Sequence, residues 1–151
     1  MGRKDLISEI RFFSRHTGPA LSPFNAWILS KSLETLPIRM DRHCSSALAL
    51  AQHLDTHPEM ESVLYPMLPS HPQHELAKKQ MTQGGGIVTF VVKGGYERAQ
   101  KFMDALQIAS KTANLGDTRT TVTHPASMTH SKLTPSERAA VGIFDGLIRI
   151  S

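Results

Sequence analysis

The clearest pattern in the chain is an apolar stripe at helical spacing between residues 22 and 54. Ser22 and Pro23 open this stretch as a helix, because serine caps a helix start and proline fits the first helical position. Pro37 removes a backbone donor, so we expect a kink or a break there. The stretch predicts one long amphipathic helix whose apolar stripe packs in the core. The stripe consists of Trp27, Leu29, Leu33, Leu36, Met40, Cys44, Ala47, Ala51 and Leu54.

The rest of the chain interleaves short strands with short helices. Residues 87–92 form the strongest predicted strand, since β-branched and aromatic residues follow one another there between glycines. The other predicted strands are 62–65, 108–114, 120–123 and 147–150, and the predicted helices are 4–13, 74–80, 96–107 and 135–140. This order predicts an α+β fold with helices on one face of a mainly antiparallel sheet.

The composition is that of an ordinary globular domain. The 151 residues are 40% hydrophobic and 20% charged, with a net charge of +4, which suits a single domain. The basic residues are scattered and not interleaved with aromatic ones, so nucleic-acid binding is not predicted. No apolar run approaches the length of a membrane span, and the lone Cys44 suits a reducing compartment. We therefore expect a cytoplasmic protein that does not cross a membrane.

The histidines do not form a recognisable metal site. His53 and His57 are four residues apart and His71 and His74 are three apart, so either pair could meet one zinc ion on a helix. Pro72 interrupts the second pair, and no cysteine or carboxylate cluster completes either. The sequence therefore predicts no bound metal.

Nucleophilic catalysis by residues of this chain is not predicted either. Ser127, Thr129 and His130 lie close together, but no acid is placed to orient the imidazole. Cys44 lies on an apolar helix face and is interpreted as an inert core thiol. Gly84–Gly86 precedes a strand and lacks the Lys-Ser/Thr of a phosphate-binding loop, so we interpret it as a flexible entry to that strand.

One arginine stands inside an apolar strand. Arg149 lies between Ile148 and Ile150 in the predicted strand 147–150. A half-buried guanidinium is costly without an anionic partner, and its planar fork of donors suits a carboxylate. Arg149 is therefore the leading candidate for binding a carboxylate ligand, and a structural ion pair within the domain is the alternative.

Three segments carry a resemblance to one enzyme family. They are NLGDTRTTVTHPASMTH at 114–130, LIRIS at 147–151 and EIRFFSRHTGPALSPFNAWILSKSLE at 9–34. Together they resemble the cysteine/methionine-metabolism family of pyridoxal-phosphate (PLP) enzymes, and the likeness covers nearly the whole chain. Within that family, the Arg-His-Thr-Gly start and the Asn-Leu-Gly-Asp form are most similar to the O-succinylhomoserine sulfhydrylases, which make homocysteine in methionine biosynthesis.

The resemblance implies a fold and a place in a longer enzyme. Residues 22–151 would form the small C-terminal domain of the aspartate-aminotransferase-like (fold type I) PLP enzymes, stopping before its last helix. Residues 1–21 would link it to a large PLP-binding domain outside this chain. The implied parent is a cytoplasmic homotetramer that acts on a small amino-acid substrate.

The resemblance also implies roles for three residues. Arg149 matches the arginine that binds the substrate α-carboxylate. Asn114 matches a position of the carboxylate site that is often serine, with a turn role as the alternative, and the backbone of Leu115 contributes beside it. None of the chain's lysines matches the one that forms the Schiff base with PLP. The piece alone is therefore expected to hold neither the cofactor nor a catalytic residue.

Two alternatives stay open. A cystathionine γ-synthase or a γ-lyase of the same family would share these segments and differ in the group that attacks or leaves. A non-catalytic interaction domain of the same fold would leave Arg149 facing solvent with no pocket nearby.

Overall fold

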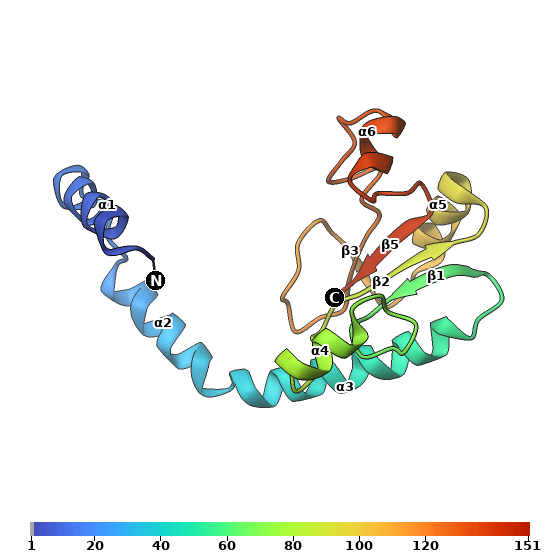
Figure 1. Ribbon diagram of the computed structural model, residues 1–151, viewed down its shortest axis with the longest axis horizontal. Helices are drawn as coiled ribbons and strands as arrows, with labels where there is room; N and C mark the ends of the chain where they lie inside the picture. The colour runs from blue at the N-terminus through green and yellow to red at the C-terminus, as the bar shows by residue number, and fades with distance from the viewer. Residues whose placement is uncertain (1) are drawn as a thin grey trace. The chain divides into compact units, whose positions relative to one another are not determined.

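The computed structural model describes residues 2–151, which divide into a first unit ending at Pro37 and a second unit, Ile38–Ser151 (Figure 1). The predicted break near Pro37 is confirmed. Thr35 separates helix α2 (Pro23–Glu34) from helix α3 (Leu36–Asp55). Pro37 is the second residue of α3, where a missing backbone N–H leaves no helical bond unmade.

The two helices of the first unit have clear local signals at their ends. α1 (Lys4–Thr17) ends at Gly18, whose φ of 77° lies in the left-handed region that glycine accepts readily. α2 begins as predicted, because the Ser22 hydroxyl accepts a hydrogen bond from the backbone N–H of Asn25 at 3.2 Å. Neither helix contains a buried residue.

The predicted core stripe is right for its second half and wrong for its first. Cys44, Ala47, Ala51 and Leu54 of α3 are buried. The other five residues are exposed, from 37% for Leu36 and Met40 to 62% for Leu33, with Trp27 and Leu29 between them. The spacing identifies an apolar face, but spacing carries no information about what covers it. Within α3, the buried residues all lie in the portion from Cys44 onward.

The second unit is built on a five-stranded mixed sheet in the order β1-β2-β5-β4-β3. Three of the four pairings are antiparallel, as predicted, and β3 runs parallel to β4. The described elements of this unit confirm the α+β class. They are the strands β1 (Met60–Leu64), β2 (Val88–Val92), β3 (Ser110–Lys111), β4 (Thr121–Thr123) and β5 (Leu147–Ile150), and the helices α4 (His74–Gln80), α5 (Gly95–Ala105) and α6 (Pro135–Ala140), beside α3.

The core lies where alternate strand residues meet the helices. Phe90 of β2 pairs with Ile148 of β5, and both are fully buried. Their cluster includes Ala47 and Ala51 from α3 and Met103 from α5. Successive side chains of a strand point to opposite faces of a sheet. The neighbours of Ile148 along β5 therefore project away from the face that carries this cluster.

One predicted strand is wrong over most of its length. The strand expected at 108–114 is reduced to β3 at Ser110–Lys111. Ile108 is 96% exposed, so its apolar side chain has no sheet neighbour to bury it. After Lys111 the chain forms a loop that turns at Gly116, where φ is 85°. This loop belongs to the candidate site.

The three-glycine segment has a packing reason beyond flexibility. A Cβ at Gly84 would lie 2.5 Å from the ring of Tyr65, so only glycine fits there. Tyr65 is fully buried, and its hydroxyl lies 3.0 Å from the carbonyl oxygen of Gly85 and 3.3 Å from that of Cys44. The segment thus seats a core tyrosine at the entry to β2. Within residues 2–151, no helix is long and apolar enough to cross a membrane.

Candidate functional site

Arg149 occupies the middle of the sheet. In the register of the strands it pairs with Thr89 of β2 on one side and with Thr123 of β4 on the other. It projects from the face opposite to Ile148, and it is half-buried. The strand pairing therefore fixes where its guanidinium can reach.

The guanidinium of Arg149 is anchored through one nitrogen. Nη2 donates to the carbonyl oxygens of Ala113 at 2.9 Å and Asn114 at 3.3 Å, and to the hydroxyl of Thr123 at 3.3 Å. These three acceptors share the two hydrogens of that nitrogen. All three are neutral oxygens, so the anchor positions the guanidinium without neutralising its charge.

The other donors of Arg149 remain available. Nε and Nη1 make no hydrogen bond or ion pair with residues 2–151, and neither is a buried atom. The structural ion pair considered as an alternative is not found in the part of the chain that the structure describes. Arg149 thus presents an unpaired cation and three N–H groups.

The loop that anchors Arg149 also contains the other two candidate residues. Asn114 accepts from Arg149 through its backbone carbonyl, and its backbone N–H donates to the Thr112 hydroxyl at 3.3 Å. The side-chain amide of Asn114 and the backbone N–H of Leu115 have no partner among the residues described. Leu115 is 54% exposed. Asn114 therefore contributes its backbone to the anchor of Arg149, and its side-chain amide has no partner among the described residues.

The loop lines an open hollow of about 760 Å³. Asn114, Leu115 and Thr121 are among its lining residues, whereas Arg149 is not. Arg149 contacts this loop through the carbonyl oxygens of residues 113 and 114. The structure thus brings Arg149 and Asn114 together through the backbone, with Leu115 next to them in the chain.

The one acid of this loop is engaged elsewhere. Asp117 accepts from the backbone N–H of Arg119 at 3.0 Å and from its Nη2 at 2.8 Å. These bonds hold the pKa of Asp117 far below its ordinary value, chiefly through the Arg119 side chain. The two charges of the turn therefore balance each other, and Arg149 keeps its own.

The anchor of Arg149 depends on a residue that sequence reasoning missed. Thr123 is 1% exposed, and its hydroxyl donates to the carbonyl oxygen of Thr112. That bond uses the only hydroxyl hydrogen, so the oxygen faces Arg149 as an acceptor. Only the β4–β5 register reveals this contact, because the two residues are 26 positions apart in the chain.

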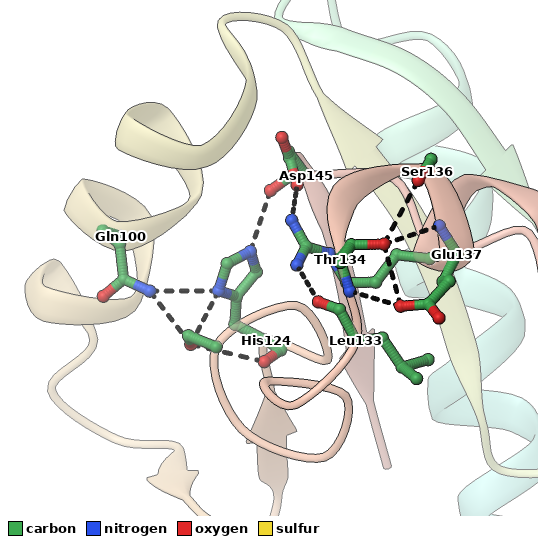
Figure 2. A network of polar contacts seen from close by, with 9 residues as sticks. Gln100, His124, Leu133, Thr134, Ser136, Glu137 and Asp145 are labelled. Carbon is green, nitrogen blue, oxygen red and sulfur yellow. Dashed lines mark hydrogen bonds and ion pairs between the residues drawn. The ribbon is translucent and has the colours of Figure 1, made fainter.

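A second polar network holds the start of β5. His124 is fully buried, and its Nε2 donates to the carbonyl oxygen of Asp145 at 2.8 Å, which leaves Nδ1 to accept from Ser127 and Gln100. Figure 2 shows Gln100 on one side of the imidazole and Asp145 on the other. Arg138 donates to the Asp145 carboxylate at 2.6 Å. Both contacts meet at Asp145, four residues before Arg149.

The comparisons with known proteins identify the family of this chain. Residues 1–151 match the family model of the Cys/Met metabolism PLP-dependent enzymes, and the protein belongs to that family. It is 53% identical over 150 residues to an O-succinylhomoserine sulfhydrylase of Pseudomonas aeruginosa, covering 99% of this chain and 37% of that protein. It is 48% identical to an L-methionine gamma-lyase of Porphyromonas gingivalis, covering 100% of this chain and 38% of the relative.

Similarity extends to a further sulfhydrylase. The chain is 45% identical over 153 residues to an O-succinylhomoserine sulfhydrylase of Mycobacterium tuberculosis, covering 99% of this chain and 38% of the relative. The chain thus spans less than two fifths of the length of these curated relatives. More than three fifths of each relative therefore lies outside the region that matches this chain.

The family uses PLP, and the lysines of this chain do not fit that cofactor. A Schiff-base lysine works in a shielded pocket. All eight lysines here are exposed, and three of them pair with carboxylates, namely Lys31, Lys78 and Lys111. No lysine lines the hollow beside Asn114 and Leu115. We assign no step through PLP to residues 2–151, which also contain no cluster of three or more potential metal ligands.

Proposed function

We propose that this chain is the C-terminal, substrate-binding part of a longer PLP-dependent enzyme, and that Arg149 binds the α-carboxylate of the amino-acid substrate. In this proposal residues 22–151 are the small domain of a fold type I PLP enzyme, and residues 1–21 lead in from a larger domain. The observation that carries it is the guanidinium of Arg149, which is held by neutral acceptors and has no carboxylate partner within residues 2–151.

The chemistry of the anchor supports a carboxylate ligand. An arginine whose rotamer is already held loses less freedom when it binds, and charged hydrogen bonds to a carboxylate are the strong ones. The unpartnered amide of Asn114 and backbone N–H of Leu115 supply further donors in the same loop. Carboxylates accept several hydrogen bonds, so this donor-rich segment suits one.

We propose a sulfhydrylation as the first candidate reaction. The longer enzyme would replace the acyloxy group on the γ-carbon of a homoserine ester, first of all the succinyl ester, with sulfide. The Cγ–O bond would break and a Cγ–S bond would form, which releases homocysteine and the free carboxylic acid. Its PLP would act as the electron sink for the carbanion chemistry and would be held by a lysine outside this chain. The 53% identity to the Pseudomonas aeruginosa sulfhydrylase supports this choice.

A γ-lyase reaction on methionine is the second candidate. The 48% identity to the Porphyromonas gingivalis methionine gamma-lyase supports it. Both reactions use an amino-acid substrate, so Arg149 would have the same role in each. The homotetramer and the cytoplasmic location stay predictions from the sequence.

A chimeric enzyme tests the proposal. This chain replaces the matching 150-residue segment of the Pseudomonas aeruginosa sulfhydrylase, and activity is assayed with sulfide and, separately, with methionine. Losing part of a charged hydrogen-bond pair costs about 1.5–3 kcal/mol, so Arg149→Lys is expected to raise KM for the amino acid by about 10- to 150-fold. Arg98→Lys, on an exposed arginine paired with Glu59, is the matched control and should leave KM unchanged. An active chimera in which Arg149→Lys leaves KM unchanged would refute the proposed role of Arg149 in binding the α-carboxylate.

A further inference from the structure

Thr123 is a polar residue where a sheet usually buries an apolar one. It is 1% exposed and lies in β4, directly beside Arg149 in the antiparallel register. Burying a hydroxyl is unfavourable unless the group makes hydrogen bonds. The contacts of Thr123 therefore indicate why a hydroxyl is present at this position.

The Thr123 hydroxyl joins Arg149 to the loop after β3. It donates its hydrogen to the carbonyl oxygen of Thr112 and accepts from Nη2 of Arg149 at 3.3 Å. The same nitrogen also donates to the carbonyl oxygens of Ala113 and Asn114. Nη2 of Arg149, the Thr123 hydroxyl and the backbone carbonyl groups of residues 112–114 thus form one connected hydrogen-bond network.

The segment 112–114 is itself tied to β4. The backbone N–H of Thr112 donates to the carbonyl oxygen of Val122 at 3.0 Å, and the Thr121 hydroxyl lies 3.5 Å from the carbonyl oxygen of Asn114. These hydrogen bonds join the loop that supplies two acceptors of Nη2 to β4, the strand that supplies the third. Thr123 is the side chain of β4 that bonds both to the guanidinium of Arg149 and to the backbone of the loop.

We propose that Thr123 is a positioning residue that holds Arg149 by Nη2 and so fixes the guanidinium, whose remaining donors are left for the substrate carboxylate beside those of Asn114 and Leu115. This inference rests on the proposed role of Arg149. Thr123 does not touch the substrate; it acts through the arginine and through the loop.

Three substitutions separate this role from a purely structural one. Thr123→Val keeps the branched shape and removes the hydroxyl, whereas Thr123→Ser keeps the hydroxyl. Thr89→Val is the matched control, because Thr89 pairs with Arg149 from the opposite strand and its side chain makes no hydrogen bond with the described residues. The volume change is the same at both positions, and only Thr123→Val removes a hydrogen bond to the Arg149 side chain.

The first readout is nitrogen NMR of the Arg149 side chain in the 151-residue chain. An anchored Nη2 slows rotation about its bond to Cζ, so slow exchange of the Nη2 hydrogens is expected in the wild type, in Thr123→Ser and in Thr89→Val. Thr123→Val should speed this exchange. Fast exchange already in the wild type would overturn the proposal, and that result does not depend on any variant folding.

The second readout is the kinetics of the chimeric holoenzyme. Thr123→Val is expected to raise KM for the amino acid about tenfold while kcat stays within about twofold, and Thr123→Ser should restore KM. Unchanged KM in Thr123→Val, or a loss that Thr123→Ser does not restore, overturns the role of Thr123. If Arg149→Lys raises KM in the same experiment, the carboxylate site stands without Thr123. If neither substitution changes KM, the proposed function falls as well.

Discussion

Arg138 and Asp145 form a short ion pair at the base of the strand that carries Arg149. Nη2 of Arg138 lies 2.6 Å from Oδ1 of Asp145, and the arginine side chain is only 10% exposed. The second guanidinium nitrogen, Nη1, donates to the carbonyl oxygen of Leu133 at 2.9 Å, the residue just before Thr134 in Figure 2. The pair thus connects the segment that leads into α6 with the turn that leads into β5.

Asp145→Ala is expected to destabilise the chain. It would leave the guanidinium of Arg138 largely buried without an anion, and Nε of Arg138 already lacks a partner in the described structure. We expect a loss of about 2 kcal/mol in the free energy of unfolding, discounted for the half-exposed carboxylate. Urea unfolding measures it. Glu59→Ala, which breaks the exposed Arg98–Glu59 pair, should cost no more than about 0.5 kcal/mol. Equal effects for the two substitutions would contradict the structural difference between the pairs.

Gly146→Ala should disturb β5 itself. A Cβ at this position would lie 2.5 Å from the carbonyl oxygen of Val92, a backbone atom that cannot rotate away. We expect about 2–3 kcal/mol of destabilisation. At Gly86 the nearest atom would be the Cβ of His43 at 3.0 Å, so Gly86→Ala should be milder. Thermal unfolding of the two variants checks the order, and a more stable Gly146→Ala would show that the strand can shift.

Asp117 should titrate well below its ordinary value. Hydrogen bonds from Arg119 lower its pKa in the folded state, so folding favours the carboxylate. The stabilisation is therefore present above the unfolded value of 3.8 and is lost as the pH falls through the depressed pKa. Carbon NMR of the Asp117 carboxyl group measures the midpoint. In Arg119→Gln it should move up toward the ordinary value, and an unmoved midpoint would rule out this pair as the cause.

The isolated chain should not bind PLP as a cofactor. Because all eight lysines are exposed, stoichiometric PLP is expected to give no saturable Schiff-base absorbance. Reduction with borohydride followed by mass spectrometry checks for specific attachment. A single modified lysine at full occupancy would contradict the placement of the cofactor lysine outside these residues.

Local signals in the sequence predict part of this structure well. α6 at Pro135–Ala140 has both bonds of a capping box between Thr134 and Glu137, and its predicted bounds are confirmed. α4 and β5 also agree with their predicted bounds. In each case the information lies within a few neighbouring residues, so no distant contact is needed to find the element.

Distant contacts explain what the sequence could not predict. The spacing of apolar residues identifies an apolar face on α2, but it does not specify which surface covers that face. The sequence therefore could not predict that Trp27 is 57% exposed. The segment 112–114 is predicted as part of a strand, but the carbonyl oxygens of Ala113 and Asn114 accept hydrogen bonds from Arg149, which lies 36 and 35 residues away. The resemblance pointed to Arg149 and Asn114, whereas Thr123 required the register of β4 against β5.

The most direct test compares two substrates in the chimeric enzyme, the homoserine ester and its α-carboxamide. If Arg149 binds the carboxylate, the enzyme with Arg149 should prefer the acid in kcat/KM by about 100-fold, since a charged hydrogen bond is lost with the amide. Arg149→Gln should reduce this preference to within about tenfold by slowing the acid and not the amide. An equal preference in the two enzymes would mean that the carboxylate is recognised elsewhere.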